Sequence, residues 1–259
     1  MIQAHSTRVA AAVVMVAAVG AATMFDARLT AEESADSDGL IQRVLAETTR
    51  SGVAVRATRE LRAGTLGGKH QGWMLVETSV TPSGAFSWNV INEGGSERTR
   101  EKVFYELLKT EADAWREGLR GSAAVSLANY QFSSLPSTRP GQVQIRLTPR
   151  RADSKLIDGT LTATEDGCPV RLEGKLAKSP SFWVKSVTIV KHYSRIAGVA
   201  LPTSIEFLAD LKMFGRSTFT MRYRYSEVNG KSVSHAVASA PFVGPTAEIL
   251  ALHSSGSEQ

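Results

Sequence analysis

The chain has 259 residues, which is enough for one large domain or two small ones. Apolar residues make up 42% and charged residues 21%, an ordinary balance for a globular protein with a sizeable core. The net charge is +5, but the lysines and arginines are spread along the chain without a run that would follow phosphates, which argues against nucleic acid as a partner.

The N-terminal segment is typical of an exported protein. One charge, Arg8, precedes the apolar stretch from Val9 to Ala22. Its length of about 14 residues fits a signal peptide and falls short of the ~20 residues of a membrane-spanning helix. Gly20 and Ala22 are small, as a signal peptidase requires, so we expect residues 1–22 to be a cleaved signal peptide and the protein to be periplasmic. The alternatives are an uncleaved anchor in the inner membrane or a buried helix.

The segment after the signal is polar and acidic, and residues 23–38 are predicted to form a flexible lead-in. Ser37 or Asp38 can cap a short helix, in which Leu40, Ile41, Val44 and Leu45 follow at helical spacing. The apolar period then changes to two, which predicts strands within residues 53–63, 73–80 and 85–92. The connections are a glycine-rich segment, 64–72, and a turn at 81–84.

One long helix is predicted between residues 93 and 121. Ser96 is a suitable cap with Glu97 in the first turn, and Gly118 and Gly121 end the helix. An apolar stripe at helical spacing contains Val103, Phe104, Leu107, Leu108, Ala112, Trp115 and Leu119. This stripe requires an apolar partner surface, which one face of a β-sheet would supply.

From Tyr130 onward the apolar residues alternate with period two. The predicted strands lie within residues 129–135, 142–149, 159–165, 168–177, 182–196, 199–213 and 216–226, with a hairpin signal at 227–232. Such alternation predicts an antiparallel sheet with one covered and one solvated face, joined as a meander. The fold class is therefore mainly β (α+β), with a single domain over residues 39–237 and a loose C-terminal tail over 238–259.

No catalytic constellation is present in the sequence. Nucleophile elbows, phosphate-binding loops and dinucleotide fingerprints are absent, and the histidines lack the spacing of a metal pair. Cys168 is the only cysteine and precludes an intrachain disulfide; we expect it to be an inert small residue. Glu206 and Asp210 share the solvated face of one strand and are weak candidates for a hydrolase. We expect a protein that is not an enzyme and uses no cofactor or metal.

The apolar face of the predicted sheet is larger than its helices can cover. A helix covers a strip ~10 Å wide, whereas ten strands would make a sheet about 48 Å across. Such a sheet must curl, and either it encloses an apolar cavity or the curl tightens until the face fills itself. The predicted lining residues are Phe207, Leu211, Met213, Phe219, Met221, Tyr223 and Tyr225 from the strands and Phe104, Leu108 and Trp115 from the long helix.

The stretch YSRIAGVALPTSIEFLADLKMFGRSTFTMRYRYSEVNGK resembles exported bacterial proteins labelled LolA-like or outer-membrane lipoprotein-sorting. Their pattern is met by Tyr193, Ile196, Gly198, Pro202, Gly215, Ser217, Phe219, Met221, Tyr223 and Tyr225. The segment INEGGSERTREKVFYELLKTEADAW is similar to the pre-helix segment of that group, and the resemblance covers residues 39–231. It implies the lipoprotein-carrier fold of LolA, LolB and RseB, a curved half-open β-barrel covered by one long helix and one short N-terminal helix.

Taken together, these observations predict an exported, non-enzymatic protein that binds an acyl chain, lipid or lipoprotein-like apolar ligand on the concave face of its sheet. In this hypothesis the long helix acts as a lid. One alternative is an envelope sensor or adaptor that binds a protein partner through a sheet edge or through the polar face that carries Arg222 and Arg224. The other is a hydrolase that uses Glu206 or Asp210.

Overall fold

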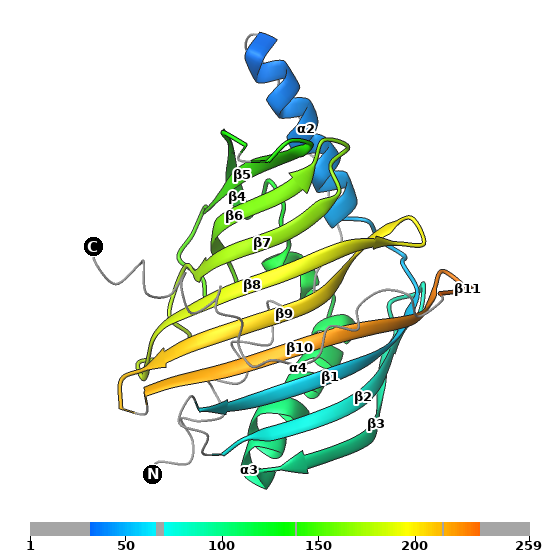
Figure 1. Cartoon of the computed structure of the whole chain (residues 1–259), viewed down its shortest axis with the longest axis vertical. Helices are drawn as coiled ribbons and strands as arrows, with labels where there is room; N and C mark the ends of the chain where they lie inside the picture. Colours follow the sequence, from blue (N-terminus) through cyan, green and yellow to red (C-terminus); the bar gives the residue numbers. More distant parts are fainter. Residues whose placement is uncertain (1–31, 66–69, 138, 214, 234–259) are drawn as a thin grey trace.

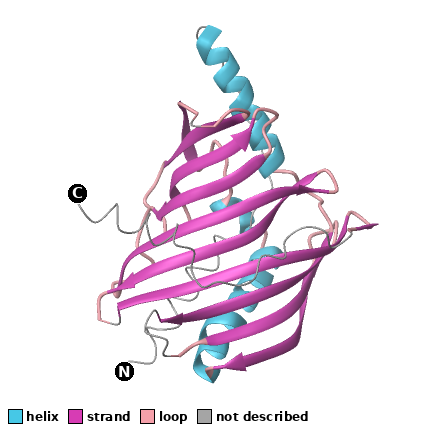
Figure 2. Cartoon of the chain, viewed as in Figure 1, coloured by secondary structure: helices cyan, strands magenta, loops and turns pink. Residues whose placement is uncertain are grey.

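A computed structural model describes residues 32–65, 70–137, 139–213 and 215–233. These residues form one open antiparallel sheet of 11 strands with helices across one face (Figure 1 and Figure 2). The predicted fold class is confirmed. The predicted signal peptide and the tail from residue 238 lie outside the described residues. Among the described residues, no helix has the length and apolar character needed to cross a membrane.

The strands follow two hairpin-connected runs. They are β1 (Val55–Thr65), β2 (Gly72–Val80), β3 (Phe86–Gly95), β4 (Tyr130–Leu135), β5 (Gln142–Pro149), β6 (Ile157–Thr164), β7 (Pro169–Leu176), β8 (Val184–Ile196), β9 (Val199–Leu211), β10 (Gly215–Val228) and the short β11 (Lys231–Ser232). The spatial order is β3-β2-β1-β10-β9-β8-β7-β6-β5-β4, with β11 paired to β10. Strands β1–β3 form one run and strands β4–β10 form the other. Each run is a meander, as the short turns predicted.

The two runs are joined by the pairing of β1 with β10, in which Leu61 lies opposite Met221 and Ala63 opposite Phe219. The alternation of each strand predicts its own two faces but carries no information about which distant strand becomes its neighbour. This junction brings the aromatic residues of β10 to the middle of the sheet, beside β1 and β9.

The N-terminal helix α2 (Glu32–Thr48) is longer than the short helix that the sequence predicted, and it begins inside the predicted lead-in. Alanine and glutamate are strong helix formers, and acidic residues stabilise a helix N-terminus, which accounts for the additional turns. Leu40, Ile41, Val44 and Leu45 are buried, as their spacing predicted. Gly167 lies so close to α2 that a Cβ atom there would come within 2.6 Å of the Arg43 Cβ atom.

The long helix runs through α3 (Glu97–Thr99), the π-helical segment η1 (Arg100–Tyr105) and α4 (Glu106–Arg116). The Thr99 N–H donates to the Ser96 hydroxyl at 3.4 Å, which confirms the predicted cap. Gly118 is in the left-handed region at φ 66°, where the helix has ended, and the 3₁₀ helix η2 (Leu119–Ala123) follows.

The apolar stripe of this helix differs from the prediction at its C-terminal end. Phe104, Leu107 and Leu108 are buried, but Leu119 is exposed because the helix ends before it. Glu111 is buried although it is charged. The π-helical segment changes the helical phase before α4 begins, so an ideal 3.6-residue period does not describe the whole face.

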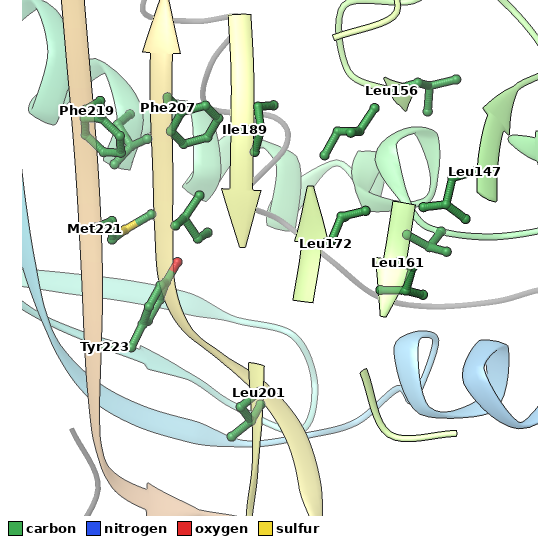
Figure 3. Packing of buried hydrophobic residues seen from close by; sticks show 14 of the residues in the cluster. Leu147, Leu156, Leu161, Leu172, Ile189, Leu201, Phe207, Phe219, Met221 and Tyr223 are labelled. Atoms are coloured by element: carbon green, nitrogen blue, oxygen red, sulfur yellow. The ribbon is translucent and has the colours of Figure 1, made fainter. Parts of the chain in front are cut away.

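The core lies between this helical layer and one face of the sheet. Figure 3 shows Phe219, Phe207 and Ile189 side by side on three neighbouring strands. Farther along the sheet, Leu172, Leu161 and Leu147 continue the same apolar layer. This continuous face is the concave surface on which the candidate site lies.

Candidate functional site

One part of the concave face is closely filled. The Phe219 ring lies 6.2 Å from the Phe104 ring of the long helix and 5.6 Å from the Phe207 ring of β9, measured between centroids. Phe104, Leu108 and Met221 are fully buried. We call the region around Phe104, Phe207 and Phe219 the filled half, because helix and sheet side chains meet there directly.

A pocket of about 430 Å³ occupies the other part of the face. Its walls come from the end of α2 and the segment that follows it, from β1, β2 and the β2–β3 turn, from α4, and from β7, β8, β9 and β10. The apolar part of the lining comprises Val53, Val55, Ala57, Val80, Pro82, Trp115, Pro169, Tyr193, Val199, Ala200, Leu201, Pro202, Tyr223 and Tyr225. The polar part comprises Glu47, Thr48, Arg50, Ser51, Arg59, Thr78, Thr81, Ser83 and Glu111.

The structure divides the ten predicted lining residues into three groups. Trp115, Tyr223 and Tyr225 line the pocket. A second group lies in or against the packed core and comprises Phe104, Leu108, Phe207, Leu211, Phe219 and Met221.

Met213 belongs to neither group. It is 70% exposed and follows β9, which ends at Leu211. The prediction that Met213 shares the concave face was wrong, because the period-two alternation stops where the chain turns.

Three tyrosines form the aromatic wall of the pocket. The rings of Tyr223 and Tyr225 are stacked, with centroids 5.9 Å apart and an interplanar angle of 6°. The Tyr225 hydroxyl donates to the Pro202 carbonyl at 2.9 Å, which ties β10 to the start of β9. Burial raises the pKa of Tyr193, Tyr223 and Tyr225 above the usual tyrosine range, so all three present neutral rings.

A buried ion pair connects the pocket floor to the helix above it. The Arg59 guanidinium donates two hydrogen bonds to the Glu111 carboxylate, at 2.6 and 3.1 Å, and both side chains are buried. The guanidinium carbon also lies 5.0 Å from the Tyr223 ring centroid and 5.4 Å from that of Phe86. Burial alone would lower the pKa of Arg59, but the Glu111 carboxylate outweighs it and the pKa is raised, so the arginine stays charged.

The sequence contains a signal for this pair, although neither residue is among the predicted lining residues. Arg59 shares the apolar parity of β1 with Ala57 and Leu61, and Glu111 lies one helical turn after Leu107 and Leu108. A charged residue on an apolar face of each element indicates a buried partner. The Arg59 Nε is also buried and has no hydrogen-bond partner among the described residues.

The rim of the pocket is fixed by Arg50, which follows α2. Its guanidinium donates to the Gly198 carbonyl in the β8–β9 turn at 3.0 Å and to the Glu47 carboxylate at 2.9 Å. The other carboxylate oxygen of Glu47, Oε2, is buried without a hydrogen-bond partner among the described residues. The rim is polar, and the interior is aromatic and aliphatic apart from Thr78 and the Arg59–Glu111 pair, a lining that suits a ligand with an apolar body.

Lys191 is a further charged residue on the concave side of the sheet, besides Arg59 and Glu111. It lies opposite Leu172 and Ile205 in the ladder, and its side chain is buried. Desolvation lowers the pKa of Lys191 to about 7. Lys191 alternates in phase with Val187 and Ile189 on β8, so its side chain enters the apolar face and is buried there.

The outer face of the sheet is less uniform than predicted. Arg224 is exposed and Arg222 half-buried, but Glu206 is buried although it was predicted to be solvated. Cys168 is a free, buried thiol whose pKa is raised by that burial. No group of three or more histidine, cysteine, aspartate or glutamate side chains suited to a metal ion occurs among the described residues.

No protein-family model and no curated protein sequence matches the chain. Among solved structures, the chain is similar to a LolA superfamily protein from Nitrosomonas europaea, with 8% identity over 76% of this chain and 94% of that one and a TM-score of 0.40. It is also similar to a DUF1329 family protein from Desulfovibrio piger, with 10% identity over 82% and 96% of the two chains and a TM-score of 0.39.

A third similarity is to lipovitellin, in a structure described as showing lipid–protein interactions, with 9% identity, 74% of this chain, 26% of that chain and a TM-score of 0.29. The predicted LolA-like architecture, a curved antiparallel sheet with a long helix and an N-terminal helix across one face, is the one that the structure shows.

Proposed function

We propose that this protein is an exported, non-enzymatic carrier that holds an acyl chain or a similar apolar ligand in the pocket between α4 and the sheet. The observation that supports the proposal is the pocket of about 430 Å³, which the helical layer leaves unfilled. Ligand pockets span roughly 300–1,000 Å³ and are mostly apolar with a few polar groups. Aromatic and aliphatic walls beneath a polar rim fit a long apolar body better than a polar substrate.

The Arg59–Glu111 pair supports a lid function for the helix. It is a buried polar link between β1 and α4. A ligand that needs more room must therefore either separate the two side chains or displace both as an intact pair. Separating a buried pair leaves two desolvated charges, which favours the closed arrangement when the pocket is empty. In this proposal the pair holds the lid over an empty pocket, and ligand contacts offset the cost of opening it.

The binding test uses a fluorescent long-chain fatty acid and two leucine substitutions on one strand. Ala57 lines the pocket, whereas Ala63 lies on the same strand and face but outside the pocket. Ala57→Leu places additional atoms in the pocket and is expected to weaken probe binding about tenfold, a loss typical of overpacking. Ala63→Leu is expected to bind the probe like the wild type.

Native mass spectrometry of the protein isolated from the cell envelope of its source provides the second test. We expect an additional mass from a bound lipid that disappears on denaturation. The fraction of protein that carries this mass should be smaller for Ala57→Leu. Bare polypeptide under gentle conditions, together with equal probe binding by both leucine variants, would reject the carrier function.

A further inference from the structure

The end of the sheet far from the pocket carries the two most exposed large apolar side chains of the described residues. Phe182, in the β7–β8 connection, is 74% exposed, and Met213, after β9, is 70% exposed. The two segments are neighbours, because the Lys212 N–H donates to the Trp183 carbonyl at 2.9 Å. The Lys212 ammonium also lies 3.7 Å from the centre of the Phe182 ring.

Local contacts hold the β7–β8 connection in this shape. The Phe182 and Trp183 rings meet edge to face with centroids 5.5 Å apart. The Val184 N–H donates to the Ser181 carbonyl at 3.1 Å, and the Ser179 hydroxyl donates to the Lys185 carbonyl at 2.7 Å. These contacts hold Phe182 exposed in a structured turn. Burying a ring of this size is favourable, so its exposure in an ordered segment indicates an interaction surface.

The charge around these side chains has one sign. Lys178, Lys185, Lys212 and Arg216 are all exposed. We call residues 178–185, 212–213 and 215–216 the basic tip; it contains four cationic and no acidic residues. Asp210 precedes the tip and lies opposite Arg216 in the ladder, so it offsets one of the four charges in part.

We propose that the basic tip docks on an anionic lipid bilayer, with Phe182 and Met213 in the headgroup–acyl boundary and the surrounding lysines and arginine against lipid phosphates. Exposed apolar side chains ringed by long basic ones are the chemistry of interfacial attachment, because the basic stems extend to the headgroups while the apolar groups leave water.

This surface lies beyond the carrier proposal and does not depend on it. The strand β9 runs from the pocket, at Val199, to the tip, after Leu211, a distance of about 40 Å along the strand. Figure 1 shows the β9–β10 connection at the left edge and the β8–β9 turn at the right. A protein docked by its basic tip therefore keeps the pocket rim away from the bilayer.

The first experiment measures co-sedimentation of the full chain with vesicles of phosphatidylcholine alone or mixed with phosphatidylglycerol. Binding is expected only with the anionic lipid and is expected to fall with added salt. Lys185→Gln and Lys212→Gln should each reduce partitioning about fivefold. The double variant Phe182→Ser/Met213→Ser should reduce it at least tenfold.

Matched controls separate the tip from other exposed positions. Ile91→Ser/Leu135→Ser removes two exposed apolar side chains from the edge strands, and Lys109→Gln removes an exposed charge from α4; both should bind vesicles like the wild type. Equal loss in the control and tip variants, or tip variants that bind as well as the wild type, would refute the docking surface. Thermal unfolding of each variant confirms that it is folded.

A site-specific probe gives a readout that attachment elsewhere in the chain cannot produce. Met213→Cys, labelled with a polarity-sensitive fluorophore, should shift its emission to the blue on anionic vesicles, whereas Leu135→Cys should not; the native thiol of Cys168 is buried. An unshifted probe at position 213 on a vesicle-bound protein would overturn the proposal. So would charge-dependent capture of an acidic protein by the tip without any binding to vesicles.

Discussion

The filled half and the pocket half of the concave face are built from the same strand, β10, yet only one of them leaves space. Phe219 contacts the Phe104 ring of the helical layer. Tyr223, four residues farther along β10, borders the pocket, as does Trp115 near the end of α4. The side chains of both halves are large and buried. The position and length of the helix, rather than the size of the sheet residues, therefore decide where the cavity forms.

The largest expected effect comes from breaking the ion pair at the boundary of the pocket. Glu111→Leu should destabilise the protein by about 3–5 kcal/mol, because it leaves the buried Arg59 charge without its partner. Arg59→Met/Glu111→Leu should restore most of this loss, since two apolar side chains replace the pair. Urea unfolding measures both values. Equal destabilisation by the single and double variants would show that packing rather than charge dominates at this boundary.

The same substitution in each half tests the difference in packing. Leu108 is fully buried in the filled half, and Leu201 lines the pocket. Leu108→Ala should cost about 3–4 kcal/mol and Leu201→Ala about 2 kcal/mol, because a new cavity adds less to a space that already exists. The comparison is made by urea unfolding of both variants. A larger loss at Leu201 would mean that the pocket half carries the more tightly coupled packing.

Lys191 predicts how stability depends on pH. Its pKa is lowered to about 7 in the folded protein, against about 10.4 in an unfolded chain. Between these values the unfolded chain binds more protons, so stability rises with pH, by about 2 kcal/mol from pH 7 to pH 9. Below pH 7 both states are protonated and this gain is absent. Lys191→Met should flatten the profile in urea unfolding; an unchanged slope would place the titrating group elsewhere.

The smallest effect is expected on the opposite face of the same strand. Arg224 alternates with Tyr223 and Tyr225 but is exposed. Arg224→Ala should change the free energy of unfolding by no more than about 0.5 kcal/mol, because an exposed side chain loses little packing or charge interaction. A loss of the size predicted for Leu201→Ala would show that the outer face also contributes to the core.

Local sequence patterns were sufficient for the elements and insufficient for the cavity. The alternation of Phe219, Met221 and Tyr223 predicted a buried face, and Ser96 marked the start of the long helix. The partition of that face into filled and empty parts depends on where α4 ends relative to β10, which only the tertiary arrangement fixes. Glu111 follows Leu107 and Leu108 at helical spacing, so its place on the apolar face can be read from the sequence, whereas its pairing with Arg59 depends on the tertiary arrangement.

The pairing of β1 with β10 also constrains the order in which the protein can be assembled. During synthesis, the first three strands and the long helix emerge well before residues 215–228, which join them to the second run. Until then both runs present unpaired backbone groups along their inner edges, where a foreign strand could add. Contacts of such high sequence separation slow folding, so the pairing of β10 with β1 is the late step that covers these inner edges and leaves β3 and β4 as the edge strands of the described sheet.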